Sequence, residues 1–112
     1  MKNNNPFVAG IADSWYSGKK ADLWVEYKYV KDLPVRANVK IDLSRLQKDW
    51  LKSRHAEGRN VAVIIGSPDG GVIFHGSTWE MYADDGIPIT TFRLMARPKP
   101  EIAEWIRAQV SF

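Results

Sequence analysis

Cysteine is absent from the 112-residue chain, and histidine occurs only twice. The absence of cysteine excludes disulfide bonds, thiolate metal sites and a cysteine nucleophile, so any metal ligands are mostly oxygens. The two histidines, His55 and His75, are too far apart in the sequence for a local zinc motif. No apolar run approaches the length of a membrane span and no secretory leader is recognisable. We therefore expect a cytoplasmic protein with no membrane partner.

Charged residues make up 26% of the chain and hydrophobic residues 45%, which is typical of a folded globular protein. The length suits a single domain, residues 1–112, and is too short for two. The net charge is only +3, but residues 17–59 contain eleven Lys and Arg against six Asp and Glu. Most of these side chains are expected to be solvated surface. Their clustering nevertheless favours a polyanionic partner such as nucleic acid.

The pattern of apolar residues predicts an α/β fold in which helices flank a mixed sheet, in the order ββαββα. Two apolar and aromatic runs flank the turn residues 17–20 and predict a β-hairpin with strands near 10–16 and 21–30. The β-branched run 61–65 predicts a strand at the centre of the sheet, covered on both faces. The turn that follows predicts a further short strand at 72–74, pairing back on it.

Two helices are expected. Ser44 and Gln47 fit a capping box, and a helix is predicted over about 44–57, with an apolar face formed by Leu43, Leu46, Trp50 and Leu51. The second helix is predicted from about Pro100 to Gln109, with Ile102, Trp105 and Ile106 on one side. A short helix could begin at Ser77 or Thr78. Residues 31–42 are expected to form a loop or an irregular strand end, and a second loop is expected to hold Asp84, Asp85 and Pro88.

In the strand expected at 21–30, side chains alternate between the two faces of the sheet. Glu26 and Lys28 therefore share one face, and Leu23, Val25, Tyr27 and Tyr29 share the other, which can pack against a helix. Asp13 lies on the preceding strand, and a hairpin that turns near Gly18 would bring it toward Glu26. Two carboxylates and one ammonium group would then converge.

This combination suits phosphodiester hydrolysis. Asp13, Glu26 and the main-chain carbonyl of Tyr27 would form the oxygen-rich site that Mg²⁺ prefers, with Mn²⁺ as a substitute. The metal would neutralise phosphate charge and lower the pKa of a bound water. Lys28 could orient or deprotonate that water, or stabilise the transition state. A Glu-x-Lys pair also occurs in ordinary solvent-facing strands, so the pair alone leaves that alternative open.

The stretches 10–13 and 22–28 resemble the Asp and Glu-x-Lys motifs of the PD-(D/E)xK nuclease superfamily, and most of all its VRR-NUC-like branch from bacteriophages. A helix carrying a Gln and then a hydrophobic strand follow in that branch, and Gln47 and the run from Val61 match them in order and spacing. The resemblance covers roughly residues 10–75. It implies a restriction-endonuclease-like fold and a Mg²⁺-dependent endodeoxyribonuclease, with Asp13, Glu26, Lys28 and Gln47 in the active site.

Two positions depart from the family pattern. Ala12 stands where the family usually has Pro, and no acidic residue precedes Gly10, where the family usually has a Glu on a helix. Another carboxylate, from this chain or from a second subunit, could replace the missing one. The candidates are Asp22, Glu101 and Glu104.

Further polar and aromatic residues have two readings each. The basic side chains that could contact DNA phosphates, or could be solvated surface, are Lys19, Lys20, Lys48, Lys52, Arg54 and His55. Gln47 could contact substrate or serve only the capping box. Trp15, Trp24 and Trp79 could stack on bases or simply pack.

The resemblance favours cleavage of Holliday junctions or other branched DNA by a homodimer with two active sites. A phage-encoded protein of this kind would act in the cytoplasm of the host cell. A freestanding site-specific endonuclease of homing type is one alternative. A DNA-binding or protein-interaction module without catalytic activity is another, and the missing acidic residue is the argument for it.

Overall fold

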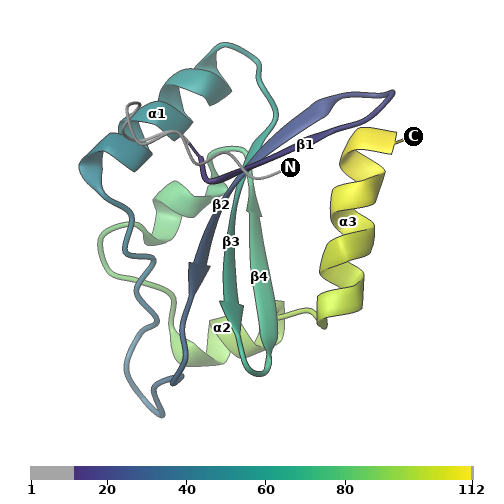
Figure 1. Ribbon diagram of the computed structural model, residues 1–112. Helices are drawn as coiled ribbons and strands as arrows, with labels where there is room; N and C mark the ends of the chain where they lie inside the picture. Colours follow the sequence, from purple (N-terminus) through teal and green to yellow (C-terminus); the bar gives the residue numbers. More distant parts are fainter. Residues whose placement is uncertain (1–11, 112) are drawn as a thin grey trace.

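The computed structural model describes residues 12–111 and consists of a four-stranded sheet with helices on both faces (Figure 1). The strands are β1 (Ser14–Ser17), β2 (Asp22–Tyr29), β3 (Val61–Ser67) and β4 (Gly70–His75). The helices are α1 (Arg45–Ala56), the 3₁₀ helix η1 (Thr78–Tyr82), α2 (Ile89–Met95) and α3 (Lys99–Ser111). No helix within this part of the chain is both long enough and apolar enough to cross a bilayer.

The sheet is mixed and its strands lie in sequence order, β1-β2-β3-β4. The pairs β1–β2 and β3–β4 are antiparallel, as expected for hairpins, whereas β2 and β3 are parallel. A parallel pair needs a crossover connection, which here is the segment that contains α1. The predicted α/β class and mixed sheet are therefore confirmed.

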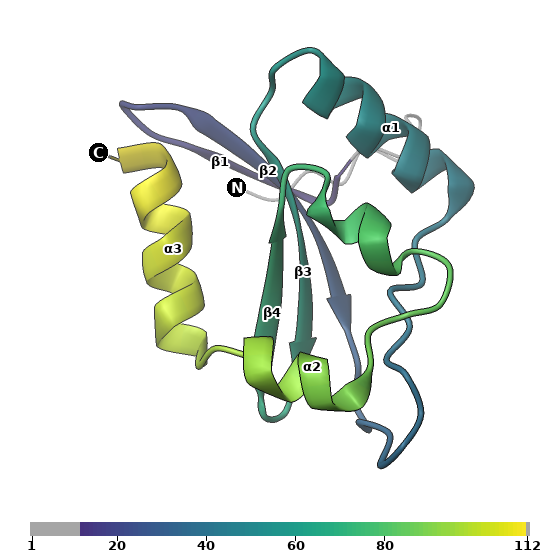
Figure 2. The same cartoon turned by 180° about the vertical axis from the view of Figure 1, so that it is seen from behind.

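Each face of the sheet has its own core. On the face covered by α1, η1 and α2, hereafter the α1 face, the strands contribute Val61, Val63, Ile65, Val72 and Phe74. On the opposite face, hereafter the α3 face, they contribute Leu23, Val25, Ala62 and Ile64, packed against α3. Figures 1 and 2 show α1 and α3 on opposite sides of the sheet. The predictions that β3 is covered on both faces and that Ile102, Trp105 and Ile106 face the core are confirmed.

Several sequence-based expectations were wrong. The loop expected around Asp84, Asp85 and Pro88 is present, but the helix α2 that follows it was not predicted; it forms because Ile89 and Phe92, three residues apart, bury their side chains in the α1-face core. Leu46 was assigned to the buried side of α1, yet it is 58% exposed. The first strand begins at Ser14 rather than near residue 10, and residues 10 and 11 lie outside the described part of the chain.

The tryptophans lie mainly in packed positions. Trp79 is 1% exposed in the α1-face core and cannot stack on a base there. Trp15 and Trp24 stack with ring centroids 5.8 Å apart, and Trp24 meets Trp50 edge-on at 5.6 Å. All three are half-buried, so the alternative of base stacking by Trp15 and Trp24 stays a prediction.

The capping box at the start of α1 is formed as predicted. The Gln47 N–H donates to Ser44 Oγ at 3.1 Å, and the Ser44 N–H donates to Gln47 Oε1 at 2.9 Å. Ser44→Ala should lower the free energy of unfolding by about 1 kcal/mol, the usual cost of losing such a cap. Urea denaturation measures this, with Ser53→Ala, an exposed change on the same helix, as control. An equal loss in both variants would contradict the capping role.

Candidate active site

Asp13, Glu26 and Lys28 come together where β1 meets β2. The register pairs Ser14 with Val25, which places Asp13, one residue before β1, opposite Glu26. The main-chain N–H of Tyr27 donates to Asp13 Oδ1 at 3.1 Å and holds that carboxylate against β2. Glu26 and Lys28 lie on the α1 face, because Glu26 pairs with Val63, whose side chain belongs to that core. The hairpin thus brings the two carboxylates onto one face.

Glu26 is a buried carboxyl group, with only 3% of the residue exposed. Burial raises the pKa of Glu26 from 4.5 to about 7; the negative charge of Asp13 and a hydrogen bond with its side chain add to the increase, while Lys28 opposes it. Near neutral pH, Glu26 is therefore close to half-protonated. A cation bound beside the pair would favour the ionised form of Glu26.

The side chain and the main-chain groups of Tyr27 point to different parts of the molecule. The side chain lies on the α3 face, where its hydroxyl is 2.6 Å from that of Tyr16. The main-chain N–H of Tyr27 points to the β1 edge, toward Asp13. Because the N–H and C=O of one strand residue point to the same edge, the Tyr27 carbonyl is also directed to that edge. Among residues 12–111 no strand pairs with β2 beyond Asp13 on that edge, and this carbonyl is a candidate metal ligand.

The donor set of this site suits Mg²⁺ rather than a cation that needs many protein ligands. Mg²⁺ usually keeps several waters and binds through one or two carboxylates plus substrate phosphate. Asp13 and Glu26 supply two carboxylates, and Tyr27 a carbonyl. Among residues 12–111 no group of three or more His, Asp and Glu side chains could hold a metal ion. Any complete coordination shell would therefore include water and substrate oxygens.

The carboxylates that were considered as replacements for the missing acidic residue lie elsewhere in the same chain. Glu101 and Glu104 are exposed on α3, which covers the opposite face of the sheet, and Glu104 pairs with Arg107. Asp22 accepts a hydrogen bond from Ser17 Oγ at the hairpin turn, four residues and about 13 Å of strand before Glu26. None of them completes the site within one subunit.

Lys28 opens onto a cavity of about 420 Å³ between the end of β2 and the following loop. Lys40 and Asp42 from that loop line the same cavity. Sequence reasoning missed both residues, because a loop without periodicity gives no sign of where it folds back. Asp42 has a φ of 56°, a left-handed conformation in which Asp is better tolerated than most residues. This cavity is a possible approach for a phosphate group to Lys28.

The remaining predicted residues are placed as follows. The side-chain Oε1 of Gln47 is engaged in the capping box, and a role in substrate contact stays a prediction. Lys19 and Lys20 are exposed in the hairpin turn, and Lys48 is half-buried on α1. Two basic residues of α1 have partners within the chain: Lys52 lies 4.0 Å from Glu80, and Arg54 lies 3.0 Å from Glu57 and over the ring of Trp50.

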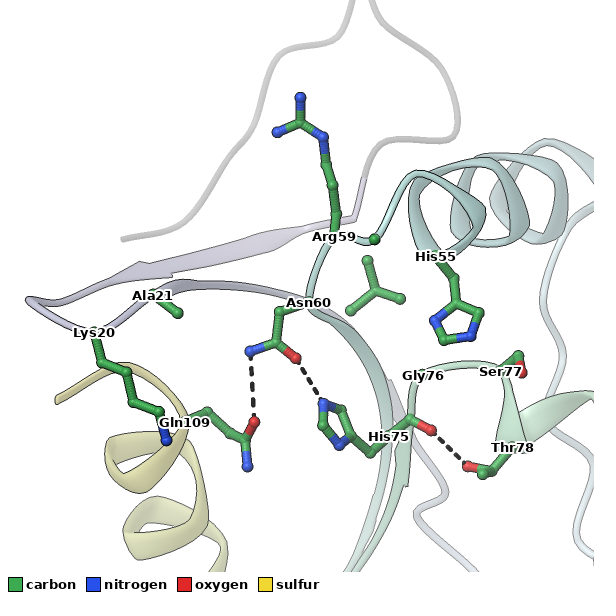
Figure 3. Close-up of a pocket in the computed structure, with 12 residues that line it drawn as sticks. Lys20, Ala21, His55, Arg59, Asn60, His75, Gly76, Ser77, Thr78 and Gln109 are labelled. Carbon is green, nitrogen blue, oxygen red and sulfur yellow. Dashed lines mark hydrogen bonds between the residues drawn. The ribbon is translucent and has the colours of Figure 1, made fainter. Parts of the chain in front are cut away.

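His55 and His75 share a second cavity, of about 710 Å³, at the end of the sheet where β3 begins (Figure 3). We call it the two-histidine pocket and define it by Lys20, His55, Arg59, Asn60, His75 and Gln109. The separation of the two histidines along the chain gave no sign of this meeting. Five parts of the fold contribute to it, namely the β1–β2 turn, α1, the loop between α1 and β3, β4 and α3, and only the tertiary structure brings them together.

Comparison with known proteins adds no further constraint. No family model matches the chain, no curated protein matches it, and no solved structure matches it. The geometry of Asp13, Glu26 and Lys28 in the structure is therefore the evidence for a site at these residues.

Proposed function

We propose that this chain is a metal-dependent DNA endonuclease that hydrolyses phosphodiester bonds at Asp13, Glu26 and Lys28. One observation carries the proposal: a buried carboxyl group of raised pKa faces a second carboxylate and a lysine where β1 meets β2. Two neighbouring carboxyl groups of which one is buried disfavour the ionised state, unless a cation is bound. Such arrangements are enriched at functional sites.

In this proposal Asp13, Glu26 and the Tyr27 carbonyl hold a Mg²⁺ ion. When bound, the ion neutralises phosphate charge and lowers the pKa of a water ligand. Lys28 presents its ammonium group on the same face as Glu26, where it can donate a hydrogen bond to a phosphate oxygen and stabilise the charge of the transition state. In its neutral form the same amine can take a proton from the attacking water.

The proposed substrate is double-stranded DNA in branched form, such as a Holliday junction, cleaved by a homodimer. The sequence resemblance supports this class of substrate, and the excess of basic residues in 17–59 supports a nucleic-acid partner. Two copies of one small domain are the simplest way to cut two strands. A second subunit could also supply a further carboxylate.

The test is a cleavage assay with the full chain on supercoiled plasmid, a four-way junction, a flap, a single strand and linear duplex. We expect cleavage with Mg²⁺ or Mn²⁺ but none with EDTA, and faster cleavage of the junction than of the linear duplex. Cleavage of linear duplex at one sequence would instead favour the site-specific endonuclease. Binding of DNA without any cleavage in Mn²⁺ would contradict the proposal and favour a module that only binds.

A further inference from the structure

The two-histidine pocket collects every histidine of the protein in one place. His55 comes from the last turn of α1, and His75 from the end of β4, twenty residues later in the chain. In Figure 3 the two rings lie on either side of the cavity, with Asn60 beside His75. None of the pocket residues belongs to the Asp13, Glu26 and Lys28 set. The pocket is therefore a separate feature of the fold.

The ring of His75 is held in position by contacts on two sides. Its Nε2 lies 2.6 Å from the Oδ1 of Asn60, and the Nδ2 of Asn60 donates to Gln109 Oε1 at 3.4 Å. The ring also meets Trp105 edge-on, with centroids 5.1 Å apart. Because an amide oxygen can only accept, Nε2 carries the hydrogen of this contact, and Nδ1 is the free ring nitrogen, which donates to a ligand only when the ring is protonated.

Gly76 makes room for the other ring. Its φ is 68°, and a Cβ at this position would come within 3.0 Å of His55 Cε1. A larger residue would force the His55 ring to move. The backbone of the turn after β4 thus allows the two histidines to approach each other.

The two lining side chains of fixed charge, Lys20 and Arg59, are both positive. In Figure 3 the guanidinium of Arg59 extends away from the two histidines, and Lys20 extends beside Gln109. No described Asp or Glu lines it. Burial lowers the pKa of His75, and the nearby His55 lowers it further. Both effects favour the neutral ring of His75, and a bound anion would favour the protonated ring, because no described carboxylate lines the cavity.

We propose that the two-histidine pocket binds a phosphate group, and that it takes this group as part of a nucleotide. The groups that would surround the phosphate are Nδ1 of His75, protonated when the anion is bound, the ring of His55 and the ammonium group of Lys20. Arg59 would join them by turning its side chain inward. The cavity is larger than a phosphate ion and lies in the size range of pockets that accept small molecules. The proposal concerns a metal-free site and does not depend on the proposed nuclease activity.

Because the protein has only two histidines, proton NMR can follow each of their rings directly. The experiment uses the full chain without metal at constant pH. The Cε1–H signals of His55 and His75 are followed during titration with inorganic phosphate, with 5′-deoxyadenylate and with deoxyadenosine. We expect both signals to shift together with 5′-deoxyadenylate and not with deoxyadenosine. Shifts with inorganic phosphate alone would overturn the nucleotide part and identify a free-phosphate site. No specific shift, or an equal shift with sodium chloride at matched ionic strength, would overturn the proposal.

Variants inside and outside the two-histidine pocket show whether 5′-deoxyadenylate binds there. His55→Gln and Arg59→Gln should each weaken binding of 5′-deoxyadenylate about tenfold or more, as expected for loss of a charge-assisted contact. Arg36→Gln, an exposed change in the loop after β2, should bind as the wild type does. Glu26→Gln should also bind normally, so failure of the nuclease proposal would not be mistaken for failure of this one. Unchanged binding in both pocket variants would contradict the assignment.

Discussion

Replacing Glu26 by Gln should lower Mg²⁺-dependent DNA cleavage by about 1,000-fold or more while the protein remains folded. The amide keeps the size of the carboxyl group and can still donate a hydrogen bond to Asp13, but it removes one of only two carboxylates at the site. With a single carboxylate left, the site would hold a divalent cation poorly. The measurement is the single-turnover rate on the junction substrate.

The matched control is Asp22→Asn on the same strand. Asp22 is exposed, and Asn keeps an acceptor for the hydrogen bond from Ser17 Oγ, so cleavage should remain within about threefold of the wild type. Circular dichroism checks that both variants are folded. If Glu26→Gln cleaves as fast as Asp22→Asn, the assignment of the active site is wrong.

The same Glu26→Gln substitution should raise the stability of the metal-free protein at pH 8. The pKa of Glu26 is about 7 in the folded chain, compared with 4.5 for an unperturbed group, so the folded state holds the proton more strongly than the unfolded state. The free energy of unfolding consequently falls as the pH rises between these two values, by about 3 kcal/mol at most. Gln carries no charge at any pH and avoids this loss. We expect the variant to be about 2–3 kcal/mol more stable at pH 8, and close to the wild type at pH 4.

Urea denaturation in EDTA at pH 4, 6 and 8 measures this difference, with Asp22→Asn again as control. A second measurement repeats the denaturation with Mg²⁺ in place of EDTA. If Glu26 is a metal ligand, Mg²⁺ should stabilise the wild type at pH 8 but not the variant. A variant that is less stable than the wild type at pH 8 would show that ionised Glu26 is not a cost to the fold. If Glu26→Gln is more stable at pH 8 but Mg²⁺ stabilises neither protein, Glu26 is a buried carboxyl group as described, and the proposed metal site is wrong.

Local patterns in the sequence predicted the elements that depend on neighbouring residues. The capping box of Ser44 and Gln47 and the apolar run 61–65 identified α1 and β3, because both signals act over a few residues. The failures have tertiary causes. Seven residues are too few for a clear helical period, so α2 was missed. Leu46 fits the period of α1, but it is exposed because no element within residues 12–111 covers it.

The two candidate sites, in contrast, depend mostly on contacts between residues that are far apart in the sequence. The sequence alone determined that Glu26 and Lys28 share a face, since that follows from the period of a strand. Whether Asp13 joins them depends on the hairpin register, and the pKa of Glu26 depends on how deeply the folded chain buries its side chain. His55 and His75 meet only because a parallel crossover brings the end of α1 beside the end of β4. Strand periodicity is a property of adjacent residues, whereas register, burial and convergence arise from contacts between distant ones, and only the tertiary structure decides them.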